Sequence, residues 1–126
     1  MAGGNWMPEL IAAAGGHNLF GAAGKHSDWM QWGELAAANP EAIIVGPCGY
    51  DLKRSLEELP LLRARPDWAL IDAVRKARVY FVDGNAYCNR PGPRLAETTE
   101  ILAEMLHPEV AGCGHRDQAW AQPDRL

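Results

Sequence analysis

Two short apolar runs constrain the fold of this chain more than any other feature of its sequence. Residues 42–46 (AIIVG) and 79–82 (VYFV) are continuous apolar segments of strand length. An apolar run without alternation is typical of a strand that is buried on both faces of a sheet. Segments with helical apolar spacing alternate with these runs, and this order predicts an α/β domain with three layers and a small parallel sheet.

The helices are predicted from capping residues, from apolar spacing and from the prolines and glycines that end them. Trp68 lies in one of these segments and is predicted to be a core residue. Residues beyond 109 show no periodicity, so 110–126 is predicted to be a loose tail behind a single unit at 1–109. Only two strands are convincing, whereas sheets usually have about four or more. The predicted helices cover residues 6–14, 31–38, 51–59, 68–76 and 93–106.

Composition narrows the function classes. The chain has 126 residues, a formal net charge of −4 and no Lys/Arg cluster, which argues against a nucleic-acid partner. No apolar run approaches the roughly 18 residues that a membrane-spanning helix needs. No signal peptide is predicted at the start, so the chain as written is expected to stay in the cytoplasm. The 3 cysteines lie at unrelated spacings, so neither a disulfide framework nor a metal site is predicted.

The loop that follows the second apolar run carries the strongest functional signal. Asn85, Tyr87, Asn89 and Arg90 lie there, between the strand and a predicted helix. Ligands of open α/β sheets bind just beyond the carboxyl ends of the strands, so these side chains are placed for ligand contact. Turn formation is the alternative role of the asparagines. The sequence has no Gly-rich phosphate loop and no nucleophile elbow, so a binding function is predicted rather than an enzyme.

Three segments together resemble one protein family. Residues 6–16 (WMPELIAAAGG), 39–45 (NPEAIIV) and 89–95 (NRPGPRL) are similar, in order and spacing, to the C-terminal lobe of substrate-binding proteins of ABC importers for cobalamin and iron–siderophore compounds. The cobalamin-binding branch is the best match. The resemblance implies the class III periplasmic-binding-protein fold, in which two Rossmann-like lobes joined by a long helix hold the ligand between them. It also implies that this chain holds only the second lobe, without that lobe's first strand.

The resemblance implies a site for a corrin ring, which is large, flat and mostly apolar. Aromatic side chains offer rigid apolar faces for such a ligand, and amide and guanidinium groups suit its polar rim. Core packing is an equally open role for Trp32, and solvation in a loop is the alternative for His26. The loops expected to rim the site are residues 4–6, 26–32, 47–50 and 85–90. The expected contacts are Trp6, His26, Trp29, Trp32, Tyr50, Asn85, Tyr87, Asn89 and Arg90.

Other ligands and one other role stay open at this point. Ala86 stands where the best-known family members carry an acid, so that polar contact is not carried over. The resemblance is also compatible with another corrinoid, a ferric siderophore or haem as the ligand. A fragment that binds nothing until it assembles with a partner lobe is the alternative to a working half-site.

The resemblance also implies partners. Family members dock on the permease of the importer through an exposed acid on each lobe, and they act in the periplasm or at the cell surface. Gly33 occupies the matching position, so Glu34 beside it is the expected docking residue, with stabilisation of a helix start as its alternative role. Loss of a strand from inside the sheet leaves backbone groups unpaired, so a marginal monomer or a strand-exchanged homodimer is expected.

Overall fold

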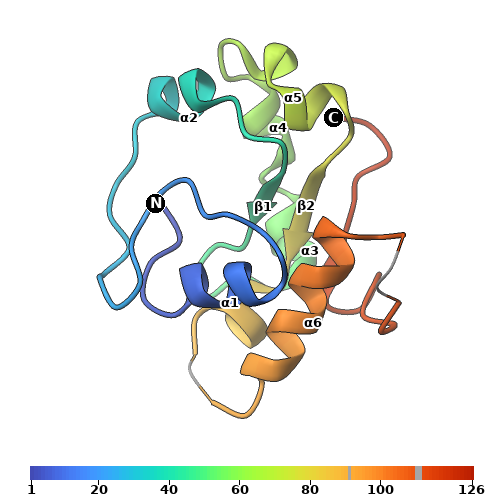
Figure 1. Ribbon diagram of the computed structural model, residues 1–126. Coiled ribbons are helices and arrows are strands. Elements are labelled where there is room, and N and C mark those ends of the chain that lie inside the picture. Colours follow the sequence, from blue (N-terminus) through green and yellow to red (C-terminus); the bar gives the residue numbers. More distant parts are fainter. Residues whose placement is uncertain (91, 110–111) are drawn as a thin grey trace.

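The computed structural model describes residues 1–90, 92–109 and 112–126, and a mixed sheet of three strands lies at its centre (Figure 1). The strands lie in the order β1-β2-β3, so β2 is the central one. β1 is parallel to β2, with Ile43 aligned with Val79, whereas β3 is antiparallel to β2. The α/β class is confirmed, and the prediction of an all-parallel sheet is corrected by β3. The strands are β1 (Ile43–Val45), β2 (Val79–Val82) and β3 (Trp120–Ala121).

Every helical segment predicted from the sequence contains a helix, but two of the segments are divided. In the segment at 51–59, the first helix, α3, ends at Leu56. A second short helix, α4, begins at Leu59 and has Pro60 in its first turn. The segment at 68–76 is divided at Ile71, whose backbone is extended. The helices are α1 (Met7–Ala13), α2 (Trp32–Ala38), α3 (Leu52–Leu56), α4 (Leu59–Arg63), η1 (Trp68–Leu70), α5 (Asp72–Arg75), η2 (Gly84–Cys88) and α6 (Leu95–Leu106).

The core consists of two clusters of apolar side chains, one on each face of the sheet. Tyr80 and Val82 of β2 belong to the first cluster, which α1 and α6 cover. Val79 and Phe81 belong to the second, which α2, α3 and the segment around Trp68 cover. All four residues of β2 are at most 4% exposed, because successive side chains of a strand point to opposite faces. The prediction that Trp68 is a core residue is confirmed, since it is 4% exposed.

The C-terminal segment differs from the prediction of a loose tail over 110–126. Its strand β3 pairs with β2, and Trp120 is 3% exposed and packs edge-on against Tyr80, with 5.6 Å between the ring centroids. Leu126 packs against the second cluster. This segment has no periodicity because a strand of two residues and the turn before it are too short to show one. Residues 110 and 111 lie outside the described part.

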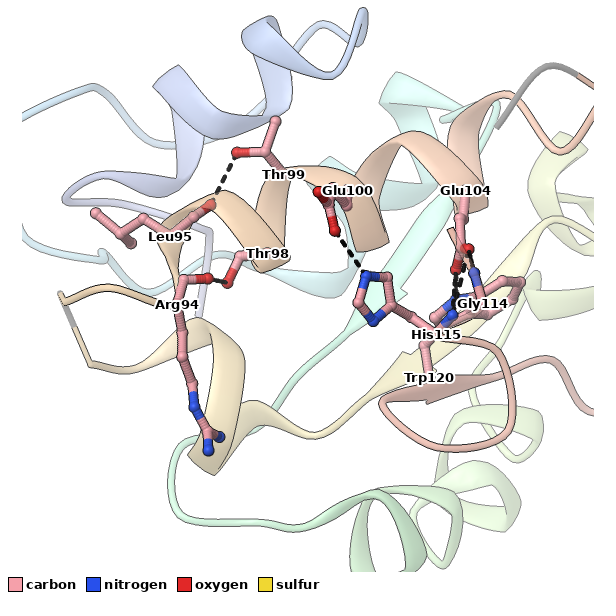
Figure 2. Close-up of polar contacts among 9 residues, drawn as sticks. All are labelled: Arg94, Leu95, Thr98, Thr99, Glu100, Glu104, Gly114, His115 and Trp120. Carbon is pink, nitrogen blue, oxygen red and sulfur yellow. Dashed lines mark hydrogen bonds and ion pairs between the residues drawn. The ribbon is translucent and has the colours of Figure 1, made fainter. Parts of the chain in front are cut away.

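A buried carboxylate on α6 holds this C-terminal segment in place (Figure 2). Glu104 is 4% exposed and accepts hydrogen bonds from the Trp120 indole N–H at 2.7 Å and from the Gly114 backbone N–H at 2.5 Å. The His115 backbone N–H also donates to it, at 3.2 Å. Desolvation alone would raise the pKa of this carboxyl, but these donors outweigh it and hold the pKa of Glu104 below its ordinary value.

Within the described ranges, none of the helices has the length and apolar character needed to cross a membrane.

Glu104→Gln is expected to lower the free energy of unfolding by about 2 kcal/mol at pH 7, because the uncharged amide replaces one acceptor oxygen by a donor that faces other donors. Urea denaturation measures this loss. The matched control is Glu100→Gln on the same helix, whose half-exposed carboxylate pairs with His115 at 2.8 Å. That change is expected to cost less than about 1 kcal/mol. Equal losses in the two variants would contradict the anchoring role of Glu104.

The stability difference between the wild type and Glu104→Gln is expected to depend on pH. Because folding lowers the pKa of Glu104, its stabilisation is fully present above the ordinary glutamate pKa of about 4.3 and is lost as the pH falls through the lower folded value. The difference in unfolding free energy between wild type and Glu104→Gln is therefore expected to shrink on the acid side. A difference that stays constant down to acid pH would contradict the stabilising role of the charged Glu104 carboxylate.

Candidate ligand-binding site

Two loops that leave the carboxyl ends of β1 and β2 are in direct backbone contact. The Asn85 N–H, after β2, donates to the Tyr50 carbonyl, after β1, at 3.1 Å. A Cβ at Gly84 would lie 2.2 Å from the Pro47 carbonyl oxygen, so only glycine permits this approach. The structure thus brings together two of the four loops expected to rim a site, at the edge of the sheet where α/β proteins bind ligands.

The second of these loops forms η2, a single π-helical turn, and two polar residues are used to build it. Asp83 Oδ1 accepts from the Ala86 backbone N–H at 2.7 Å, and the Asn89 amide donates to the Gly84 carbonyl at 2.5 Å. Asn89 was predicted as a ligand contact, with turn formation as the alternative. In the structure its side chain forms part of the turn. Turns of this kind are frequent at functional sites.

The two tyrosines of these loops each carry an arginine over one face. Tyr87 is half-buried against the first core cluster, and the Arg94 guanidinium carbon lies 5.5 Å from its ring centroid. Tyr50 has the Arg54 guanidinium carbon 4.6 Å from its ring centroid. A flat ligand can therefore stack only on the parts of these rings that the arginines do not cover.

A hollow of about 570 Å³ lies between the η2 loop and the start of α6. Asn85 and Arg90, both predicted as contacts, line it. Arg94 and Glu97 line it as well and were missed by sequence reasoning. No sequence signal marked them, because α6 begins only at Leu95, so the spacing of four residues between Arg90 and Arg94 does not place them on one helix face. The lining residues are Asn85, Ala86, Arg90, Gly92, Pro93, Arg94 and Glu97.

The other two loops expected at the site are also partly brought together. The Gly4 N–H donates to the Ser27 hydroxyl at 3.0 Å, and the Asn5 N–H donates to the Lys25 carbonyl at 2.6 Å. His26 is therefore held beside the start of the chain, exposed to solvent.

The aromatic residues of these two loops differ in exposure. Trp29 is 84% exposed, the most exposed large apolar side chain among the described residues. Trp6 is half-buried, and its indole N–H is buried with no partner in the described part of the chain. Met7 of α1, next to Trp6, and Tyr87 of the η2 loop both pack against the first core cluster.

Trp32 and Glu34, on α2, have local roles. The Trp32 ring lies against Trp68, with 6.1 Å between the centroids, and its indole N–H donates to the Pro66 carbonyl at 2.6 Å. The structure thus places Trp32 in core packing, the alternative to ligand contact. Glu34 is exposed and accepts from the Gln31 backbone N–H at 2.8 Å in a capping box that fixes the start of α2.

Cys88, next to the site, is poorly suited to metal binding or to nucleophilic chemistry. Burial, and to a smaller extent the charge of Asp83, raise the pKa of the Cys88 thiol to about 12, so it stays protonated at neutral pH. In residues 1–90, 92–109 and 112–126, no three His, Cys, Asp or Glu side chains are grouped as a metal site requires. What the arrangement offers is hydrogen-bond donors, guanidinium groups and aromatic rings around a hollow.

A second hollow, of about 510 Å³, lies apart from these loops, between α2 and η1. Small and apolar residues such as Ala36, Ala37 and Leu70 line it. Figure 1 shows α2 close to α5, at the end of the sheet where the strands begin. The lining of this second hollow contains none of the predicted contact residues.

Comparison with known proteins decides the family. The sequence pattern of the family described as periplasmic binding protein matches residues 1–86, which include β1, β2 and both loops at their carboxyl ends up to Ala86. This chain belongs to the periplasmic binding protein family. Members of this family are binding proteins of transport systems rather than enzymes.

One relative adds the type of transport system. Over 107 residues, the chain is 36% identical to a Bacillus subtilis (strain 168) protein named uncharacterized ABC transporter substrate-binding lipoprotein YvrC. The match covers 83% of this chain and 30% of YvrC, so the chain spans less than a third of the length of that relative. No solved structure matches the chain.

Gly84→Ala tests the contact between the two loops of this periplasmic binding protein. The new Cβ would collide with the Pro47 carbonyl, so a loss of unfolding free energy of about 2 kcal/mol or more is expected in urea denaturation. The control is Gly33→Ala on α2, where nothing lies within 4 Å of the new Cβ. Here a gain of about 0.5 kcal/mol is expected from helix propensity. A neutral Gly84→Ala would mean that the loops are not locked.

Proposed function

We propose that this chain binds cobalamin or a related corrinoid, as the C-terminal lobe of the substrate-binding protein of an ABC importer. The observation that carries the proposal is the locked pair of loops at the carboxyl ends of β1 and β2, in a chain that belongs to a family of transport binding proteins. The proposed ligand is cargo, and the chain needs no catalytic group.

The proposed lobe has the Rossmann-like form of the class III periplasmic binding proteins, and it includes the C-terminal segment, because β3 and Trp120 belong to its sheet and core. Helices on both faces of the sheet and the parallel pairing of β1 with β2 support this form. In the described part of the chain, β1 pairs with β2 only, so its other edge is open. We propose that this edge takes a further strand, from an N-terminal lobe of such a protein or from a strand-exchanged second copy.

The proposed contacts are side chains that are at least partly exposed in the structure. Asn85 and Arg90 line the hollow and would hydrogen-bond polar groups on the rim of the ligand. Tyr50, Tyr87 and the exposed Trp29 would present ring faces to the corrin, with the ring of Trp6 behind them. His26 is a candidate axial ligand of the cobalt, because it is exposed in the loop beside Gly4.

A second candidate ligand is a ferric siderophore, or haem, because the hollow carries two guanidinium groups that favour an anionic ligand. A third reading is that the chain binds weakly or not at all until a partner lobe closes the cleft. Half a cleft contacts about half of the ligand surface, and affinity falls accordingly.

Two further features of the importer are proposed on the same basis. Glu34 is exposed on α2 and is the proposed contact with the permease, in addition to its capping role. The working location is outside the cytoplasmic membrane, in the periplasm or at the cell surface, as the family description and the lipoprotein relative suggest.

Titration with cyanocobalamin, followed by calorimetry, tests the proposal. Saturable binding at one site is expected, with a Kd in the range of about 10–100 μM for a half-site. Asn85→Ala is expected to weaken it about 5-fold, through the loss of one ligand hydrogen bond. Gln118→Ala removes an exposed amide from the C-terminal turn and is expected to change nothing. Absence of binding to the folded chain, or equal effects of the two variants, would contradict the proposed site.

Aquocobalamin tests the axial-ligand role of His26. A shift in its visible spectrum that cyanocobalamin does not show is expected on binding, because only the aquo form has an axial ligand that imidazole readily displaces. His26→Ala is expected to abolish the shift while cyanocobalamin still binds. A shift that survives in this variant would assign the axial position to another group.

A further inference from the structure

The lining of the hollow at the start of α6 carries more positive than negative charge. Arg90 and Arg94 both line it, with Glu97 as the one acid in the lining. In the part of the chain that the structure describes, neither arginine has a carboxylate oxygen within 4.0 Å. Two guanidinium groups around one hollow repel each other, and an anion placed between them would remove that repulsion.

Three other basic side chains, Arg54, Arg75 and Lys76, pair with acids. What sets Arg90 and Arg94 apart is that both line one hollow. Arg54 also lies over a tyrosine ring, but it is bound to Glu58 at 2.7 Å. Lys76 pairs with Asp72 at 3.2 Å. The chain as a whole carries a formal net charge of −4, so an unneutralised cationic pair is not a consequence of a generally basic surface.

The guanidinium group of Arg94 is placed by its contact with Tyr87, and its backbone by the first turn of α6. Its guanidinium group lies over the Tyr87 ring at 5.5 Å, and its carbonyl accepts from the Thr98 hydroxyl at 2.9 Å. Figure 2 shows its side chain leaving the start of α6 and extending away from the helix, beside the η2 turn. α6 has 12 residues, and the free N–H groups of its first turn add partial positive charge at the same end.

We propose that Arg90 and Arg94 form a subsite for a phosphate or phosphodiester group of the ligand. This inference rests on the proposed function and adds to it that the ligand is anionic where it meets the start of α6. Guanidinium groups bind phosphate oxygens in pairs, and Asn85 on the same wall supplies a further donor. The hollow, about 570 Å³, is larger than a lone phosphate needs, which fits an anion attached to a larger molecule.

The test compares two corrinoids that differ at the anionic group. Cyanocobalamin carries a phosphodiester in its nucleotide loop, whereas dicyanocobinamide lacks the loop and the phosphodiester. Cyanocobalamin is expected to bind about 10-fold more tightly, in line with two charge-assisted hydrogen bonds. Arg94→Gln is expected to abolish most of this difference. Arg75→Gln on α5, which removes a guanidinium 3.9 Å from Asp72, is the charge-matched control and is expected to preserve the difference.

The outcomes separate this inference from the proposed function. Equal affinity for the two corrinoids, or a difference that survives in Arg94→Gln, overturns the subsite while corrinoid binding stands. If neither corrinoid binds, the proposed function fails, and inorganic phosphate alone decides the subsite. Saturable shifts in the amide NMR signals of 85–90 and 94–97 that vanish in Arg94→Gln then support a site for a free or differently attached phosphate. Absent shifts, or shifts that persist in that variant, overturn it.

Discussion

The double-sided burial of β2 is the constraint on which the rest of this structure depends. Its four residues are shared between two core clusters, Tyr80 and Val82 facing α1 and α6, and Val79 and Phe81 facing the helices on the other side. Both neighbouring strands pair with β2 and not with each other. The position of its carboxyl end therefore fixes where the η2 loop begins, and through the Asn85–Tyr50 backbone hydrogen bond it also fixes the loop after β1.

The fold uses some of the polar and aromatic residues near this end and leaves others exposed around the hollow. Asn89 closes the η2 turn, and Trp32 completes the packing around Trp68. Asn85 and Arg90 remain on the wall of the hollow, and Arg94, stacked on Tyr87, joins them there. A site built from exposed donors on a rigid strand end is suited to recognition, which agrees with membership of a family of transport binding proteins.

Predictions from the sequence were correct where a local pattern indicates burial. They failed where a contact between distant residues determines the structure. The apolar run at 79–82 predicted a fully buried strand, and Trp68 was correctly placed in the core. The strand β3 could not be predicted, because two residues have no period and their place is set by hydrogen bonds from Trp120 and the turn before it to Glu104. Asn89 was ambiguous, since asparagine suits both a turn and a ligand. Arg94 was overlooked because its importance comes from the distance to Tyr87.

The central claim is that the loops after β1 and β2 form the ligand-binding edge of this protein. The most direct test is an amide NMR titration of the labelled chain with cyanocobalamin, which reports the contact residue by residue. The account predicts that the largest shifts fall in residues 48–50 and 84–90, with few changes around the hollow between α2 and η1. Shifts confined to that second hollow, at Ala36, Ala37 and Leu70, or no shifts at all, would contradict it.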